Sequence, residues 1–274
     1  MNLGNVAKDE SILERLIQIQ VRMLDNVIDL NTIEVPQAQH TNKQYRAIGL
    51  GMFGLHHYFA LKGLQWGEDE SIEETNRITE KIAYLTIKTS SNLAKEKGKA
   101  PYSEGSDWEN GKHLEMRGYF NSSTALPVEQ WKELQKELTE YGVRNLFMLA
   151  PAPNASTSVI AGSTASLDPI FNIFYHEEKK SYKLPVLAPD LSYKTYEFYN
   201  QPAYQIDQFK SVKLREKIQR NIDQASSFNL FVPNNIRASV LLDLHLDIWK
   251  RGIKTTYYVR STATRVESCE WCEA

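Results

Sequence analysis

The sequence predicts an α/β fold in which helices alternate with short buried strands. Segments with apolar residues at helical spacing alternate with short apolar runs, two of which end at a proline. Because strands separated by helices commonly pair in parallel, we expect parallel pairing. The sequence contains no internal repeat and no low-complexity linker. We therefore expect one domain over residues 1–259, followed by a polar, flexible tail over residues 260–274.

Three helices are expected in the first hundred residues. Ser11 and Glu14 match a capping box at the start of the first helix, and Pro36 prevents its continuation. The third helix ends at Gly98, a suitable C-cap. The expected helices cover residues 11–30, 43–61 and 69–97.

The second of these helices contains Gly49, Gly51 and Gly54. A glycine inside a helix costs about 1 kcal/mol relative to alanine. The glycines therefore indicate either a non-helical opening of this segment or close packing of its backbone.

The rest of the chain mixes helices, strands and loops. Residues 101–125 are rich in Gly, Ser, Asn and Asp and are expected to form a long surface loop. Residues 151–169 are expected to form a second loop, and residues 176–208 an irregular segment. Helices are expected over residues 127–141, 212–227 and 236–250, and strands over residues 145–150, 229–232 and 255–259.

Charge and composition exclude several classes of function. The chain has 32 Lys and Arg against 34 Asp and Glu, which gives no bulk attraction to a nucleic acid polymer or a membrane surface. It has no apolar run of about 18 residues, as a membrane span requires. The N-terminus lacks a basic region followed by an apolar stretch, so it does not match a secretory signal. We expect a cytoplasmic protein.

The only two cysteines, Cys269 and Cys272, lie in the last six residues. Their spacing allows a local disulfide or dithiol. The histidines provide no second ligand pair at zinc-site spacing, so we expect no metal site. A thioredoxin-type site would open a helix, whereas this pair ends the chain. A mobile dithiol that delivers electrons elsewhere fits best in a reducing compartment, and an incidental pair in a tail is the alternative.

Tyr257 and Tyr258 end the last expected strand. Neighbouring strand residues normally face opposite sides. Taken alone, the pair is most simply explained as two half-buried strand aromatics.

The loop after the strand over residues 145–150 contains Asn154, Ala155, Ser156 and Thr157. Backbone N–H groups and hydroxyls in such a loop can hold a phosphate. A solvated loop or a helix N-cap explains the same residues equally well.

Together, and in this order, these elements resemble the C-terminal part of the catalytic (large) subunit of class I ribonucleotide reductase. The resemblance covers essentially the whole chain, and its most specific element is the tyrosine pair followed by the tail cysteines. The matching stretches are Asn2-Leu3-Gly4, residues 46–51 with Gly54-Leu55-His56, residues 93–98, the loop over 153–169, and residues 252–258.

The resemblance implies a fold and a radical route. The family's catalytic domain is a ten-stranded α/β barrel made of two five-stranded halves, so this chain is expected to form the C-terminal half. Tyr257 and Tyr258 match the inner end of a radical-transfer route, because a phenol can lose an electron and a proton together.

The resemblance also assigns a substrate and a reductant. Asn154, Ala155, Ser156 and Thr157 match the segment that holds the diphosphate of a ribonucleoside diphosphate, with only backbone contacts at Ala155. The two tail cysteines match the thiols that reduce the active-site disulfide and are reset by a thioredoxin or glutaredoxin. No cofactor is implied for this chain, since a metal-containing small subunit supplies the radical.

The chain departs from the family in one respect, because it has no cysteine before Cys269. The family's thiyl-radical cysteine and the two cysteines of its active-site disulfide precede the point that matches Asn2. The chain alone is therefore predicted to be inactive, either as one half of a split large subunit or as a piece of a longer one. Its half-barrel edges and apolar faces favour association with an N-terminal chain.

Two alternatives remain open: a stand-alone dithiol redox module, and a catalytically incomplete interaction protein. Replacing Tyr257 by Phe separates the first from a reductase, because simple dithiol exchange does not need a phenol. The absence of a complete active site argues for the second, and the retained tail dithiol, tyrosine pair and hydroxyl-rich loop argue against it.

Overall fold

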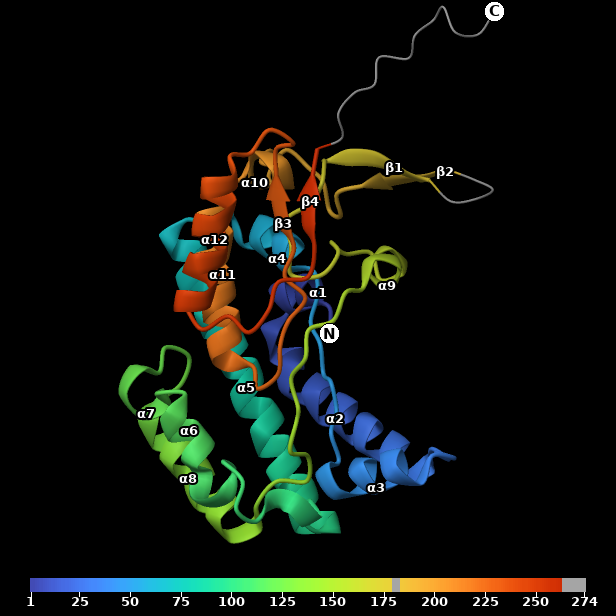
Figure 1. The fold of residues 1–274 in the computed structure, drawn as a ribbon, viewed down its shortest axis with the longest axis vertical. Coiled ribbons are helices and arrows are strands. Elements are labelled where there is room, and N and C mark those ends of the chain that lie inside the picture. Colours follow the sequence, from blue (N-terminus) through green and yellow to red (C-terminus); the bar gives the residue numbers. More distant parts are fainter. Residues whose placement is uncertain (179–182, 263–274) are drawn as a thin grey trace, which may run out of the picture.

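The computed structural model describes residues 1–178 and 183–262, in which helices surround a central row of extended segments (Figure 1). The α-helices are α1 (Leu3–Lys8), α2 (Leu13–Leu30), α3 (Pro36–Tyr45), α4 (Leu55–Lys62), α5 (Asp69–Lys97), α6 (Lys112–Met116), α7 (Tyr119–Ser122), α8 (Val128–Tyr141), α9 (Ala155–Ile160), α10 (Tyr196–Tyr199), α11 (Gln208–Asn221) and α12 (Ala238–Lys250). The 3₁₀ helices are η1 (Glu10–Ile12), η2 (Pro101–Ser103), η3 (Glu109–Gly111) and η4 (Ala203–Gln205). The strands are β1 (Phe174–Glu178), β2 (Lys183–Leu187), β3 (Leu230–Val232) and β4 (Val259–Ser261).

Backbone hydrogen bonds join the first members of the row. The N–H of Leu3 donates to the carbonyl of Phe53 at 2.9 Å, and a parallel bridge pairs Asn2 with Phe53. A second parallel bridge pairs Leu50 with Leu149. The segments at residues 1–3, 48–53 and 147–151 therefore lie side by side in chain order.

The row continues to the end of the described chain. The N–H of Ser227 donates to the carbonyl of Pro151 at 2.9 Å. Beyond it β3 and β4 pair in parallel, with Leu230 opposite Val259. The parallel pairing expected from the sequence is confirmed for these segments.

Helix α5 supports the row from one side. It packs against α11, α2 and α8, and buries apolar residues such as Ile78 and Ile82 completely. Acidic residues in its first turn and basic residues in its last turn match the helix dipole. Gly98 follows it with φ +85°, which confirms the predicted end of this helix.

A buried charge network closes one end of the row. The fully buried Asp25 of α2 contacts Arg46 at 2.9 Å, Lys97 at 3.3 Å and Arg144 at 3.4 Å. The side-chain amide of Asn145 also donates to Asp25, at 3.1 Å. Since Arg46 and Asn145 begin two extended segments, the network fixes the start of both segments to α2.

The predicted helix over residues 43–61 is wrong. Helix α3 ends at Tyr45, residues 46–54 are mainly extended, and α4 begins at Leu55. A Cβ on Gly51 would lie 3.4 Å from the carbonyl oxygen of Ala150, so the extended backbone packs closely there. The glycines indicated a non-helical opening or close backbone packing, and the segment shows both.

The predicted capping box at Ser11 is also wrong. The carboxylate of Asp9 accepts from the N–H of Ser11 at 3.0 Å and caps the short helix η1. Helix α2 then begins at Leu13 without a side-chain cap. The upstream aspartate takes the role that the sequence pattern assigned to the serine.

The predicted surface loop over residues 101–125 is instead folded against the core. It contains α6 and α7, and its Trp108, Leu114 and Tyr119 are buried. The ring of Tyr119 stacks on that of Trp131 of α8 with centroids 3.9 Å apart. The polar composition of the segment concealed these aromatic anchors.

Three further expectations need correction. Within the segment over 145–150 only Leu149 forms a β-bridge, to Leu50, and the last strand begins at Val259 rather than at residue 255. The loop over 151–169 contains α9, and the segment expected to be irregular contains the hairpin β1–β2, which projects beyond the helices (Figure 1). The helices expected over 127–141, 212–227 and 236–250 correspond to α8, α11 and α12, and the strand expected over 229–232 corresponds to β3.

Candidate functional site

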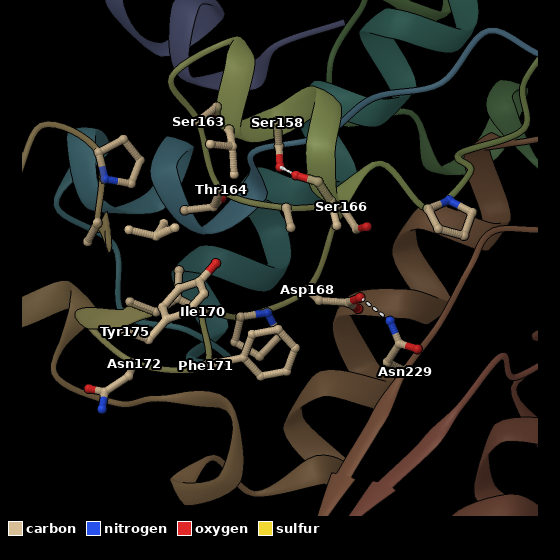
Figure 2. A pocket seen from close by; sticks show the side chains of 18 of the residues that line it. Ser158, Ser163, Thr164, Ser166, Asp168, Ile170, Phe171, Asn172, Tyr175 and Asn229 are labelled. Atoms are coloured by element: carbon tan, nitrogen blue, oxygen red, sulfur yellow. Dashed lines mark hydrogen bonds between the residues drawn. The ribbon is translucent and has the colours of Figure 1, made fainter. Parts of the chain in front are cut away.

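A cavity of about 110 Å³ lies where the chain leaves the segment at residues 147–151 (Figure 2). One wall is the stretch over 153–166, which includes α9. The other walls come from residues 168–175, from residues 186–189 at the end of the hairpin, and from Asn229, Phe231, Tyr257 and Arg260. The cavity thus collects residues from distant parts of the sequence.

Hydroxyl side chains gather on the first wall. Ser158, Ser163, Thr164 and Ser166 line the cavity and are buried (Figure 2). The hydroxyl of Ser158 donates to the carbonyl of Ala155 at 2.7 Å. Side-chain hydroxyls can both donate and accept, so this wall can contact a polar ligand group.

A buried ion pair supports the opposite wall. Asp168 pairs with Arg215 of α11. It also accepts a hydrogen bond from the amide of Asn229 at 2.6 Å (Figure 2). Burial raises the pKa of Asp168, against the opposing effect of Arg215 and Asn229. The guanidinium of Arg215 also lies 5.0 Å from the ring centroid of Phe228. These contacts fix residue 168 relative to β3.

Tyr257 lines the cavity and contacts Tyr258. The two ring centroids are 4.1 Å apart, and each side chain is about half exposed. A hydrogen bond with Tyr258 raises the pKa of Tyr257. The backbone N–H of Tyr257 donates to Phe228 at 2.7 Å. Because both tyrosines precede β4, they do not follow the alternation of a regular strand, and their rings touch.

The other residues predicted from the sequence have different positions. Ala155 lines the cavity, whereas Ser156 and Thr157 are exposed and lie outside its wall. The side chain of Asn154 accepts from the backbone N–H of Ser166 at 2.9 Å, so it braces the loop. The tail cysteines at 269 and 272 lie outside the described residues.

Sequence reasoning missed Asp168, Arg215, Phe171 and Tyr175. Phe171 lines the cavity from just before β1, and Tyr175 lines it from within β1. No local pattern marked these residues, because Arg215 sits on an otherwise ordinary amphipathic helix and reaches Asp168 only through the fold.

Two negative findings apply to residues 1–178 and 183–262. No three His, Cys, Asp or Glu side chains are grouped so that they can hold a metal ion. No helix in this part of the chain has both the length and the apolar composition needed to cross a bilayer.

Comparisons with known proteins agree on one family. Residues 1–259 match the family model described as ribonucleotide reductase, barrel domain. The chain is 42% identical to the ribonucleoside-diphosphate reductase subunit alpha of Treponema pallidum over 271 residues, which are 98% of this chain and 31% of that protein. The subunit alpha of Helicobacter pylori is 36% identical over 97% of the chain, and that of Bacillus subtilis is 31% identical over 99%. These matches cover 34% and 41% of the two relatives, so the chain spans about a third of the length of the curated relatives it matches.

Proposed function

Because the chain belongs to the ribonucleotide reductase family, we propose that it forms the C-terminal half of the catalytic barrel of a ribonucleoside-diphosphate reductase large subunit. The half-barrel in this proposal is the domain expected over residues 1–259, which β4 extends to Ser261, and the rest of the tail expected over residues 260–274 follows it. The row of parallel segments supports it, since segments from residues 1–3 to 257–262 are joined in chain order by backbone hydrogen bonds.

The chain acts only together with an N-terminal part of the large subunit. It has no cysteine before Cys269, so the thiyl-radical cysteine and the active-site disulfide must come from that part. Whether the two parts share one chain or associate as two, the proposal predicts no ribonucleotide reduction by residues 1–274 alone.

The observation that carries the proposal is that Ala155 and Tyr257 line one cavity. The family resemblance assigns the diphosphate of the substrate to the loop at 154–157 and the radical route to the tyrosine pair. The two assignments are compatible only if loop and tyrosines lie close together, as they do here. The hydroxyls of Thr164 and Ser166 on the same wall add donors for a phosphate.

The proposed radical route uses Tyr257 and Tyr258. Their ring centroids lie 4.1 Å apart, close enough for transfer from one phenol to the other. The exposed ring area leaves access for a small subunit that supplies the radical. Tyr257 then passes the radical to a cysteine of the N-terminal part.

The proposed reductant is the tail dithiol of Cys269 and Cys272. One thiolate attacks the oxidised active-site disulfide and forms a mixed disulfide, and the second thiol resolves it. A thioredoxin or glutaredoxin then reduces the tail disulfide. The proposal includes no cofactor bound to this chain, and it places the reaction in the cytoplasm.

Reconstitution tests this function. The chain is mixed with the N-terminal part of a relative's large subunit, the small subunit, a ribonucleoside diphosphate and thioredoxin, and deoxyribonucleotide is measured. Activity should require both halves. Replacing Cys269 and Cys272 by Ser should permit a first turnover and stop later ones with thioredoxin. Full multiple turnover by the double variant would refute the tail's role, and sustained activity of residues 1–274 alone would refute the half-barrel.

A further inference from the structure

His57 of α4 lies directly behind the hydroxyl-lined wall of the cavity. Its side chain is 2% exposed, and both ring nitrogens have partners. Nδ1 lies 3.1 Å from Oγ of Ser163, and Nε2 lies 2.9 Å from Oδ2 of Asp190. The backbone N–H of His57 also donates to Oγ1 of Thr164 at 3.2 Å. One residue therefore connects two parts of the cavity wall.

Two glycines leave room for this connection. A Cβ on Gly4 would lie 2.2 Å from Nδ1 of His57, and a Cβ on Gly54 would lie 2.2 Å from Oγ of Ser163. Real Cβ atoms do not approach other atoms so closely, so any larger residue at either position displaces the imidazole or the hydroxyl. The two side chains are thus fitted against the backbone of α1 and of the turn before α4.

The charged neighbours determine where the imidazole carries its hydrogen. A carboxylate only accepts, so Nε2 donates to Asp190 and Nδ1 of the neutral ring accepts from the hydroxyl of Ser163. Burial lowers the pKa of His57, and Asp190 opposes this effect. Lys8 of α1 forms an ion pair with Asp190 at 2.7 Å and also lowers the pKa of His57. The ring is therefore neutral at pH 7.

The contacts of His57 with Ser163 and Asp190 do not form a nucleophilic site. Ser163 is 8% exposed and packs against Gly54, so its hydroxyl has no free approach for an electrophile. Asp190 adopts φ +50°, a conformation that a non-glycine residue keeps only when its surroundings hold it. Its contacts with His57 and Lys8 supply that support. The arrangement is a structural brace.

We propose that His57 is a positioning residue that holds Ser163 and Thr164 at a fixed distance from residues 188–190. Both parts line the cavity, at Ser163 and Thr164 on one side and at Ala188 and Pro189 on the other. The brace keeps the cavity in a shape that admits its ligand. The inference rests on the proposed function only in taking that ligand to be a ribonucleoside diphosphate.

Two variants separate the contacts of the two ring nitrogens. In His57→Asn the side-chain amide can take the place of Nδ1, which keeps the contact with Ser163 and loses the one with Asp190. In His57→Gln the amide can take the place of Nε2, which keeps Asp190 and loses Ser163. Neither amide titrates, and both remove part of the same ring.

Hydrogen exchange of the amides at residues 158–166 measures the brace without any ligand. We expect exchange in His57→Gln to be about two- to tenfold faster than in the wild-type chain, as the loss of one hydrogen bond predicts, and exchange in His57→Asn to remain close to wild type. Asp190→Ala, at a side chain that is 42% exposed, should give a smaller increase. Equal exchange in the Gln and Asn variants would overturn the inference, because simple loss of packing affects both alike.

Binding of CDP and of inorganic pyrophosphate to the same proteins then tests whether the ligand of the cavity is a ribonucleoside diphosphate. Because each variant breaks the connection at one end, we expect both to weaken CDP binding about two- to tenfold relative to the wild-type chain, whereas the exposed His40→Asn should bind CDP as the wild type does. If the exchange results separate the variants but the wild-type chain binds neither probe, the brace stands and the proposed substrate site fails. If both variants bind CDP as tightly as the wild-type chain does, the positioning role fails and the proposed function is unaffected.

Discussion

Where Arg46 and Asn145 begin their extended segments, Asp25 is completely buried and its carboxylate contacts three cationic side chains. Where the same segments end, a cavity is lined by apolar residues together with the hydroxyls of one wall, and Tyr257 and Tyr258 are half exposed. One end of the row is thus closed by paired charges, and the other is open and lined by groups that can still bind.

The two ends therefore have different roles. A buried charge is tolerated only with its partners, so the closed end contributes to stability and to the placement of the segments. Ligands of α/β proteins bind beyond the carboxyl ends of parallel strands, which is the open end here. Variants at the closed end should change stability, and variants at the open end should change activity.

The largest effect is expected for Tyr257→Phe at the open end. Phenylalanine keeps the ring but has no phenolic hydrogen to lose, so the reconstituted reductase should fall to assay background while the melting temperature stays near that of the wild type. Tyr193→Phe, at a side chain that is 88% exposed and outside the cavity wall, is the matched control and should keep full activity. Substantial activity of Tyr257→Phe would remove the main distinction between the two ends.

At the closed end, Asp25→Ala should destabilise the chain by about 3–5 kcal/mol, because it leaves buried cations without their carboxylate. Urea unfolding measures the change. Asp29→Ala is the control, since Asp29 also contacts Arg46 but its side chain is 46% exposed, and it should cost about 1 kcal/mol or less. Similar costs for the two variants would contradict the assignment of the closed end to stability.

Sequence reasoning predicted the closed end poorly and the open end in part. Helix α5 was predicted with its correct bounds because its period and its C-terminal glycine agree. The extended segment at 46–54 was predicted to be helical, because its apolar residues recur near helical spacing and only the glycines argued otherwise. Nothing local indicated that Asp25 and Arg144 meet, since they are 119 residues apart.

At the open end, the resemblance identified Ala155 and Tyr257, which line the cavity. It did not identify the residues that hold the cavity in shape, such as His57 and Asp168. Their partners are distant in sequence, at residues 163, 190, 215 and 229, and become neighbours only when the chain folds. A local sequence pattern reflects the chemistry within one segment, so contacts between distant segments cannot be recognised from it.

The open end should also be sensitive to acid through His56. Nε2 of His56 lies 2.9 Å from the carbonyl of Phe198 and therefore donates to it, while Nδ1 accepts from the N–H of the cavity residue Ile170 at 3.0 Å. Complete burial lowers the pKa of His56 to about 4, whereas an unfolded histidine titrates near pH 6.5. Protonation would place a second N–H against that of Ile170.

The lowered pKa of His56 determines how stability changes with pH. Above about pH 6.5 the stability from neutral His56 is fully present, and it falls as the pH drops toward 4, because only the unfolded chain takes up the proton. The loss at pH 4 is about 3 kcal/mol. Urea unfolding between pH 7.5 and 5 gives the free energy of unfolding at each pH, and its slope against pH gives the number of protons taken up on unfolding. This number should be lower by about one in His56→Gln and unchanged in the exposed His40→Gln. An unchanged slope in His56→Gln would show that His56 is not the group responsible.

The smallest expected effect comes from Gly54, where the segment at 48–53 meets the open end. Gly54 has φ +85°, and a Cβ there would lie 2.2 Å from Oγ of Ser163. Gly162 also has a positive φ, +63°, but a Cβ there would meet nothing within 4 Å. Both alanine variants therefore carry the cost of the backbone conformation, and only Gly54→Ala adds a clash.

Gly54→Ala should lose about 1–3 kcal/mol more stability than Gly162→Ala, the usual cost of overpacking a well-packed site. Because the clash displaces the hydroxyl of Ser163 from His57, faster hydrogen exchange should appear at residues 158–166 in Gly54→Ala and not in Gly162→Ala. Equal stability of the two variants would mean that Ser163 moves aside without cost. The cavity wall would then be easier to deform than its buried hydrogen bonds indicate. If the difference in hydrogen exchange between the two variants is confined to residues 158–166, the strain lies at the open end and the charge network around Asp25 is unaffected.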